Sequence, residues 1–402
     1  MLGAAGSPHL DFRSILIGGT NGKGSVAAMA EALLRANGPL TGLYTSPHLV
    51  DPAERIRIGG RPIDPELFER CAQRVLPLAE LTEATFFESL TAVAFFAFAE
   101  AGVETAAVEV GLGGRLDATN VLQPDACVIT NVSLDHADWL GDSLEAIATE
   151  KAGIIKRSVP LITGRLSGES RTVVESRAAE VGAPLVQLGR DFGAAEVTTG
   201  CAGTRFTYWC EDGRAPDGAE FAVPLPGDYQ ADNAALALSA VREAGHSLAV
   251  ESSRLALRNL DWPGRFQLLN HSGTTLVLDV AHNPAGAENL AAALDRIPLP
   301  LPRVGLIGIL GDKPWREMLT PLLDRLDEAV FTSPPSAPAE RAWDPFEARA
   351  AVPAASVEVE RRFPEALDRA LELAGSGTVL VTGSNHTVGD ALREIEARKQ
   401  RG

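Results

Sequence analysis

A glycine-rich segment near the start of the chain has the composition of a phosphate-binding loop. It follows the apolar run at 14–17 and precedes a helix predicted at 24–37. Glycines permit a tight turn that points N–H groups at phosphate oxygens, and a helix N-terminus adds a favourable partial charge. The residues expected to contact the nucleotide are Gly19, Thr20, Asn21, Gly22, Lys23, Gly24 and Ser25.

Two side chains of this loop carry most of its expected chemistry. Lys23 is predicted to reach the β- and γ-phosphates, and the hydroxyl of Ser25 is predicted to join a magnesium shell. Gly24 separates the two residues, whereas the common GxxxxGK[ST] pattern places the lysine directly before the hydroxyl residue. This spacing disfavours an ordinary GTPase or motor protein. A Gly-rich turn with an unrelated lysine is the alternative, which the strand–loop–helix context disfavours.

Charged side chains follow two other predicted strands. Glu109 ends the strand-like segment TAAVEV, and His136 comes shortly after ACVITN. Ligands of open α/β sheets gather at the carboxyl ends of the strands, so both residues are candidates for a metal site. Magnesium prefers oxygen ligands, which makes Glu109 the stronger candidate on residue type alone, with Asp135 as a partner of His136. A solvated carboxylate and a hydrogen-bonded loop histidine are the alternatives.

The elements that must position these residues alternate along the first half of the chain. Helices of ordinary length between short apolar strands predict a parallel sheet covered on both faces. The predicted strands are 14–19, 41–46, 105–111, 126–131 and 160–164, and the predicted helices are 24–37, 64–79, 84–101 and 142–151.

The second half of the chain has a different order of elements. Residues 192–226 predict antiparallel strands with Gly- and Asp-rich turns, and helices follow at 229–245 and near 251–260. After the turn DWPGR, βα alternation resumes and continues to the end. We therefore predict an α/β protein of two domains. Residues 1–262 form a P-loop domain with a mostly parallel sheet and a small antiparallel sheet, and residues 263–402 form a Rossmann-like α/β domain.

Composition restricts the class of protein. The formal net charge of −17 argues against nucleic-acid binding, which needs a basic face. Four cysteines without a CxxC pair indicate reduced thiols. The first residues lack the pattern of a signal peptide, and no apolar run is long enough to span a membrane. These features predict a cytoplasmic enzyme, taken to be a monomer, that acts on small molecules.

Several sequence blocks occur in a recognisable order. GTNGKGS is the form of the loop seen in the Mur ligase superfamily. The later blocks are TSPHLVDPAERIRI (45–58), TFFESLTAVAFFAF (85–98), EVGLGGRLDATN (109–120), LDHADWLG (134–141), EKAGIIK (150–156) and LDVAHNPAG (278–286). Together they resemble the folylpolyglutamate synthase/dihydrofolate synthase family over nearly the whole chain.

The resemblance implies a magnesium site, with two ions expected. It assigns Ser46, Glu109 and His136 as metal ligands beside Ser25. Lys151 corresponds to a lysine that carries a carbamate in this family, and an anionic carbamate suits a metal site better than an ammonium. Lys23, Lys151 and His136 are then the catalytic residues. For Lys151 the alternative is a surface lysine paired with Glu150 or capping its helix.

The resemblance also implies substrate contacts. Arg265, Asp279 and His282 correspond to positions that contact ATP, and Asn233, with Gln230, belongs to another such block. For Arg265, Asp279 and His282 the alternative is a turn that starts a helix. For Gln230 and Asn233 the alternative is a helix cap. Phe87 and Asp117 correspond to the pterin pocket, where a ring can stack and a carboxylate can accept N–H bonds. Their alternatives are a core aromatic and a residue that shapes the Gly-Gly loop.

The implied activity is ATP-dependent addition of L-glutamate to dihydropteroate, to the γ-carboxylate of tetrahydrofolate, or to both. The reaction would pass through an acyl phosphate and release ADP and phosphate, as part of folate biosynthesis and one-carbon metabolism. A Mur-type ligase that extends a peptidoglycan precursor is the alternative within ligases. A nucleotide-binding regulatory module without catalysis and a switch GTPase are alternatives of other classes.

Overall fold

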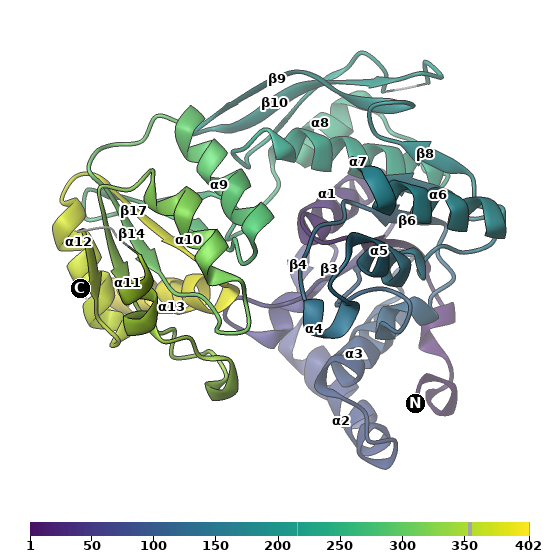
Figure 1. Cartoon of the computed structure of the whole chain (residues 1–402). Helices are drawn as coiled ribbons and strands as arrows, with labels where there is room; N and C mark the ends of the chain where they lie inside the picture. The colour runs from purple at the N-terminus through teal and green to yellow at the C-terminus, as the bar shows by residue number, and fades with distance from the viewer. Residues whose placement is uncertain (215, 353–355, 402) are drawn as a thin grey trace. The chain divides into compact units, whose positions relative to one another are not determined.

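The computed structural model describes residues 1–214, 216–352 and 356–401. The chain folds into two compact units (Figure 1). The first unit comprises Met1–Val197, Arg205–Val223 and Gln230–Leu260, and the second comprises Thr198–Thr204, Pro224–Tyr229 and Asp261–Gly402. Within the described residues, no helix is long and apolar enough to cross a membrane.

The first unit is built on an eight-stranded sheet. Its order is β4-β3-β2-β5-β1-β6-β7-β8. The six strands β2, β5, β1, β6, β7 and β8 run parallel, and β3 and β4 are antiparallel additions at one edge. The strands are β1 (Arg13–Gly18), β2 (Thr41–Tyr44), β3 (Ile56–Ile58), β4 (Arg61–Pro62), β5 (Thr105–Glu109), β6 (Ala126–Ile129), β7 (Leu161–Thr163) and β8 (Leu185–Gln187). The predicted mostly parallel sheet is confirmed.

Helices cover both faces of this sheet. α2 and α3 pack together, and their apolar side chains form one core with alternate strand residues such as Leu16 and Val108. α1 contacts β2 and β5, and its buried residues, such as Val26 and Leu33, lie outside that core. The helices are α1 (Lys23–Arg35), α2 (Pro65–Leu81), α3 (Phe86–Ala101), α4 (Ala137–Leu140), α5 (Leu144–Ala152), α6 (Gly168–Val181), α7 (Tyr229–Glu243) and α8 (Val250–Arg258), with 3-10 turns at Leu2–Ala5, Pro8–Leu10, Pro52–Arg55 and Ala118–Val121.

Local sequence explains where α3 begins and ends. Thr85 and Glu88 form a reciprocal capping box that satisfies N–H groups of the first turn, and Gly102 ends the helix with φ 71°. The run between them is apolar almost all round, so the helix is buried from Leu90 to Phe98. Its first turn, which holds the TFFE motif, is thereby fixed beside the sheet.

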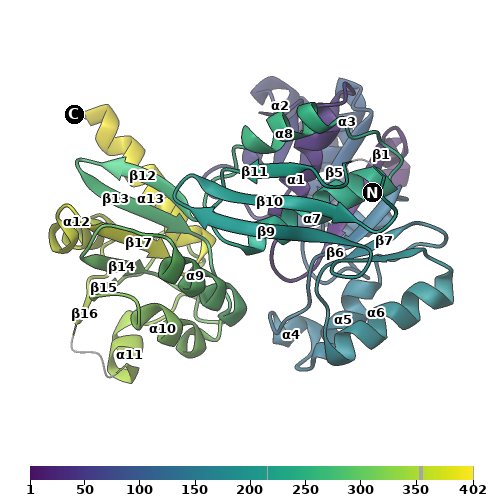
Figure 2. The same ribbon diagram turned by 90° about the horizontal axis from the view of Figure 1, so that it is seen from above.

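A three-stranded sheet follows, in the order β11-β10-β9. Its strands are β9 (Phe192–Gly200), β10 (Gly203–Cys210) and β11 (Glu220–Val223). β9 and β10 run side by side as a hairpin, and a connection of two residues between them requires antiparallel pairing (Figure 2). This is the small antiparallel sheet that the turn residues predict.

The second unit contains a six-stranded sheet of order β12-β13-β17-β14-β15-β16. Only the β12–β13 pair is antiparallel. The elements are β12 (Gln267–His271), β13 (Thr274–Asp279), α9 (Pro284–Arg296), β14 (Arg303–Ile307), α10 (Trp315–Leu323), β15 (Glu328–Phe331), a 3-10 turn (Ala339–Arg341), α11 (Pro345–Ala351), β16 (Val357–Val359), α12 (Phe363–Ala374), β17 (Thr378–Thr382) and α13 (Asn385–Arg401). This arrangement confirms the Rossmann-like α/β class.

Candidate nucleotide and metal site

The carboxyl ends of four neighbouring parallel strands bring the predicted residues of the first unit together. In the order β2-β5-β1-β6, these ends lead into Ser46, Glu109, the phosphate loop and the segment 130–136. The Ser46 N–H donates to Glu109 Oε2 at 2.9 Å. Glu109 is only 5% exposed, so its carboxylate lies within the sheet edge and not in open solvent. The strand-end candidates are thus neighbours of the loop.

The phosphate loop needs glycine at two points. Gly19 has φ 135°, and a Cβ there would lie 1.9 Å from Thr130 Oγ1. Gly22 has φ 84° and caps α1, and a Cβ there would lie 2.6 Å from Asn233 Oδ1. Backbone conformation and close packing therefore both require these glycines. Lys23 is the first residue of α1, so the loop leads directly into a helix N-terminus.

Two lysines converge on the backbone of this loop. Lys23 Nζ donates to Thr20 O at 3.0 Å, and Lys151 Nζ donates to Gly19 O at 2.9 Å. Lys151 is 4% exposed, although it lies in the last turn of a helix, α5, whose other face carries exposed polar residues. Burial, with the nearby Lys23 charge, lowers the pKa of Lys151 to about 7. Burial therefore favours the neutral amine more than in an ordinary lysine. The burial of Lys151 excludes the alternative of a surface lysine, and Glu150 pairs with Arg115 instead.

His136 lies in the segment that follows β6. Its backbone has φ 54°, its N–H donates to Asp135 Oδ1 at 2.9 Å, and its Nε2 lies 3.8 Å from the same oxygen. Asp135 thus accepts from the backbone of His136, and the role of Asp135 as a partner of the imidazole stays a prediction. Ser25 is buried in the first turn of α1.

These residues fit a magnesium ion that arrives with nucleotide phosphates. Among the residues that the structure describes, no three Cys, His, Asp or Glu side chains form a cluster able to hold a metal alone. Protein sites for magnesium–nucleotide complexes commonly use one or two carboxylates and leave the other positions to phosphates and water. Glu109 supplies such a carboxylate. Ser133 Oγ, on the same segment as His136, is buried with no partner among the described side chains and backbone groups, and it offers a further oxygen.

Asn233 also reaches the phosphate loop. It lies on α7, is 7% exposed, and its Oδ1 is next to Gly22. Its Nδ2 donates to Gln230 Oε1 at 3.0 Å. Gln230 Nε2 is a buried donor that has no partner in the part of the chain that the structure describes. The pair is therefore placed beside the loop, with one donor still available.

The second unit brings Arg265, Asp279 and His282 together at the end of β13. Asp279 Oδ2 accepts from Phe266 N–H and Oδ1 accepts from Ala281 N–H, each at 2.9 Å. Burial raises the pKa of Asp279, while Arg265, the two N–H groups and His282 act in the opposite direction. His282 Nδ1 lies 2.9 Å from Val280 O. Asp279 thus holds two segments together, the one before β12 that carries Arg265 and the one after β13 that carries His282.

The two predicted pterin residues have clear structural partners. The ring of Phe87 packs on Gly111, where a Cβ would lie 2.4 Å from its Cζ, and its centroid is 6.2 Å from that of Tyr44. Asp117 Oδ2 accepts from Leu112 N–H and Oδ1 from Thr119 N–H, each at 2.9 Å, and burial raises its pKa. Both residues therefore shape the loop after β5, whatever else they contact.

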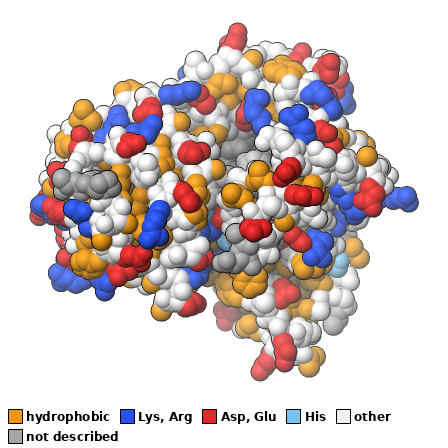
Figure 3. Space-filling view, viewed as in Figure 1, with side chains coloured by type: hydrophobic (Ala, Val, Ile, Leu, Met, Phe, Trp, Pro, Cys, Tyr) orange, Lys and Arg blue, Asp and Glu red, His pale blue; other side chains and the backbone are white. Residues whose placement is uncertain are grey.

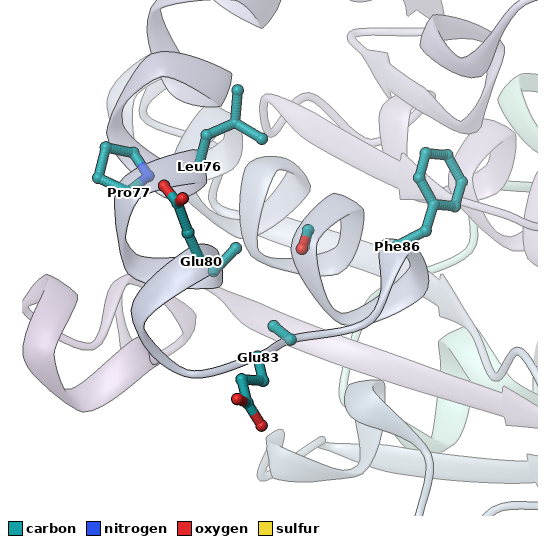
Figure 4. Close-up of a pocket in the computed structure, with 8 residues that line it drawn as sticks. Leu76, Pro77, Glu80, Glu83 and Phe86 are labelled. Atoms are coloured by element: carbon teal, nitrogen blue, oxygen red, sulfur yellow. The ribbon is translucent and has the colours of Figure 1, made fainter.

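Phe86, which the sequence analysis did not select, is the exposed ring of the same motif. It is 63% exposed, and the Arg55 guanidinium lies 5.6 Å from its centroid. It also borders a surface pocket of about 580 Å³ at the turn between α2 and α3 (Figure 4). The other lining residues are Leu76, Pro77, Ala79, Glu80, Glu83, Ala84 and Ser89, none of which belongs to the phosphate loop.

Comparison with known proteins places this geometry in a family. Residues 17–241 match the Mur ligase middle domain, and residues 264–385 match the Mur ligase glutamate ligase domain. The chain is 37% identical to folylpolyglutamate synthase of Lacticaseibacillus casei over 343 residues, which cover 83% of this chain and 78% of that protein. It is 33% identical to dihydrofolate synthase/folylpolyglutamate synthase of Escherichia coli, with 96% and 87% covered.

Solved structures agree with this relationship. Mycobacterium tuberculosis folylpolyglutamate synthase complexed with ADP superimposes with a TM-score of 0.88 at 34% identity, covering 98% of this chain and 92% of the other. E. coli FolC in complex with DHPP and ADP gives a TM-score of 0.83 at 31% identity, again with 98% and 92% covered. This chain belongs to the folylpolyglutamate synthase/dihydrofolate synthase family of Mur ligases.

Proposed function

We propose that this chain is an ATP-dependent amide ligase that adds L-glutamate to dihydropteroate, to the γ-carboxylate of tetrahydrofolate, or to both. One observation carries the proposal: a phosphate loop, a buried carboxylate and a buried lysine meet at one sheet edge of a chain in this family. The relatives named above are synthases of this kind, and two of them are solved with ADP.

The reaction would proceed in two steps. A carboxylate oxygen of the acceptor attacks the γ-phosphorus of ATP, the bond to the β-phosphate oxygen breaks, and an acyl phosphate and ADP form. The neutral amine of glutamate then attacks the acyl carbon, phosphate leaves, and the amine proton is lost to solvent or a base. Lys23 suits the first step, because its ammonium can move from Thr20 O to balance charge on the phosphates.

Magnesium would be held by Ser25, Ser46, Glu109 and His136, and it would supply positive charge beside the transferring group. Lys23, at the start of α1, would bind the phosphates from the loop side. Asn233 in the first unit, and Arg265, Asp279 and His282 in the second, are proposed nucleotide contacts. Phe87 and Asp117 are proposed to face the pterin.

We further propose that Lys151 carries a carbamate. A neutral amine adds to CO₂ and loses one proton, which leaves an N–H that can still donate to Gly19 O. The lowered pKa of Lys151 supplies the neutral amine, and its burial protects the product from water. An anion here is also better matched to Lys23 and a metal than a second cation would be.

Small molecules are the proposed partners, in a monomeric cytoplasmic enzyme. On the face seen in Figure 3, Lys and Arg side chains are interspersed with Asp and Glu and form no continuous basic surface. The net charge of −17 agrees with this view. Neither feature favours a nucleic-acid partner.

ADP release is the direct test. The purified chain would be given ATP, magnesium and glutamate with dihydropteroate in one reaction and with tetrahydrofolate in another. Release that depends on both glutamate and an acceptor is expected, and it should disappear in Lys23→Ala with an unchanged circular dichroism spectrum. No acceptor-dependent release with either pterin, or full activity of Lys23→Ala, would contradict the proposal.

A further inference from the structure

The segment after β6 is bonded to the middle of the phosphate loop. Asn131 Oδ1 accepts from Asn21 N–H at 3.0 Å, and Asn131 Nδ2 donates to Asn21 O at 2.9 Å. Thr130 Oγ1 donates to the same Asn21 oxygen at 2.7 Å. The backbone takes part as well, because the Thr20 N–H donates to Asn131 O at 3.0 Å. The backbone N–H and the backbone C=O of Asn21 are thus both engaged by side chains about 110 positions away in the sequence.

These bonds divide the N–H groups of the loop into two sets. Those of Thr20 and Asn21 donate to Asn131 and are aimed at the protein. α1 begins at Lys23, and the first N–H groups of a helix have no intrahelical acceptor. The first N–H of the helix to bond back is that of Val26, which donates to Gly22 O. Among the residues that the structure describes, none accepts from the N–H groups at positions 22–25, which therefore remain for an anion.

We propose that Asn131, assisted by Thr130, is a positioning residue of the nucleotide site. Asn131 holds the backbone N–H and C=O of Asn21 in the orientation that turns the N–H groups of the following residues toward the phosphates. The proposal rests on the nucleotide binding proposed above. It adds that the N–H groups of Thr20 and Asn21 bind the protein while those of residues 22–25 bind the phosphates, which the GTNGKGS motif alone does not indicate.

The bonds from Thr130 and Asn131 to the phosphate loop are here called the clamp. The segment that forms the clamp also connects the phosphate loop to His136, a candidate metal ligand. Thr20 and Ser133 exchange two hydrogen bonds, from Thr20 Oγ1 to Ser133 O at 3.2 Å and from Ser133 N–H to Thr20 Oγ1 at 3.1 Å. Three residues further on lies His136. Thr130, Asn131 and Ser133 therefore fix the phosphate loop, and the same segment then leads into Asp135 and His136. Loss of the clamp should disturb the phosphate and metal contacts together.

Binding of Mg·ADP, measured by isothermal titration calorimetry, tests the proposal without requiring turnover. A neutral hydrogen bond is worth about 3–10-fold in an equilibrium constant. Asn131→Ala removes two and should weaken Mg·ADP binding by about 10–100-fold. Thr130→Val removes one bond with nearly unchanged shape and should weaken binding by about 3–10-fold. Thr130→Ser keeps the hydroxyl and should bind like the wild type.

A matched control separates positioning from stability. Ser170 is buried on α6 in the same unit, and its Oγ donates to Ser167 O at 2.7 Å. Ser170→Ala loses one hydroxyl-to-carbonyl bond, as Thr130→Val does, so its Tm should fall by a similar amount with no change in the Kd for Mg·ADP. In steady-state assays, Asn131→Ala should raise the KM for ATP and leave the KM for glutamate unchanged.

The outcomes are distinguishable. If Thr130→Val and Asn131→Ala lose only thermal stability, as Ser170→Ala does, the two residues are structural and the inference is wrong. If Asn131→Ala does not fold, the Thr130→Val and Thr130→Ser pair decides alone. A folded wild type that does not bind Mg·ADP would instead overturn the proposed function together with this inference.

Discussion

Lys151 is the residue whose chemistry departs furthest from its ordinary form. It is buried, its pKa is lowered to about 7, and its Nζ is bonded to the phosphate loop. We predict that Lys151→Arg loses at least about 100-fold in turnover, beyond the 10–100-fold typical of metal-supporting residues, because a guanidinium cannot form a carbamate. Glutamate-dependent ADP release measures the loss.

The control for Lys151 is chemical rescue. In Lys151→Ala, a small carboxylic acid in solution can occupy the vacated space and restore part of the rate, whereas the same acid should not help Lys23→Ala. Normal activity of Lys151→Arg would show that positive charge is what the site needs. The proposal that Lys151 carries a carbamate would then be wrong.

Asp117 distinguishes two roles that sequence leaves open. Its carboxylate already accepts from Leu112 and Thr119, so Asp117→Asn, which replaces one acceptor oxygen by a donor, should strain the loop after β5. If the carboxylate also binds the pterin ring, loss of a charged hydrogen bond of roughly 1.5–3 kcal/mol raises the KM for the pterin about 10–150-fold. We expect that rise with little change in the KM for ATP. Equal changes in both KM values would assign Asp117 to loop shape alone.

At the scale of single residues, the sequence could predict which residue types form the site, but it could not predict the hydrogen bonds between residues far apart in the chain. Lys23, Glu109 and Lys151 stand in motifs with a chemical meaning, and the structure brings the first and last of these to the same loop. Asn131 stands in an ordinary strand-end segment. Its function comes from bonds to backbone atoms of a distant residue, which no spacing rule reveals.

Among elements, the phosphate loop depends most on fit. Gly19→Ala would place a methyl group 1.9 Å from Thr130 Oγ1 at φ 135°, so the loop must move away from β6. We predict a loss of stability of about 1–3 kcal/mol from overpacking, in addition to backbone strain, and a large loss of ADP affinity. Gly38→Ala is the matched control, because its φ is 105° and nothing lies within 4 Å of the new methyl group. Urea unfolding and ADP titration of both variants measure the difference, and equal behaviour would contradict the prediction.

Several long elements were predicted close to their observed bounds, whereas α6 and most of the shortest strands were not predicted. The helix predicted at 84–101 is observed at Phe86–Ala101, and the strand predicted at 105–111 is observed at Thr105–Glu109. β3, β4, β8 and β16 have two or three residues each, too few to show alternation. Residues 334–345 are rich in proline, a composition typical of a surface loop. Trp343 is nevertheless buried there, with its Nε1 donating to Thr332 O at 2.8 Å.

For the whole molecule, the division of the chain is more complex than one boundary near residue 262. The tip of the β9–β10 hairpin, Thr198–Thr204, and the segment Pro224–Tyr229 belong to the second compact unit. Within that unit, Cys201 Sγ lies 3.5 Å from Pro298 O, and Arg296 pairs with Asp228. Sequence could not predict this, because a long hairpin shows no break where it passes from one unit to the other.

The predicted domain 263–402 can still be tested as a folding unit. Its sheet, β12 to β17, and its core from Phe266 to Leu380 lie wholly within residues 261–402. We therefore predict that the fragment 261–402 folds cooperatively by itself. It should be less stable than a version carrying 198–204 and 224–229 on a linker, by about 1–2 kcal/mol, because an ion pair and a weak hydrogen bond are lost. Urea unfolding followed by circular dichroism measures both, and the fragment should not bind ADP tightly because it lacks the phosphate loop. A fragment without a cooperative transition, even with the two segments restored, would mean that the second unit depends on the first to fold.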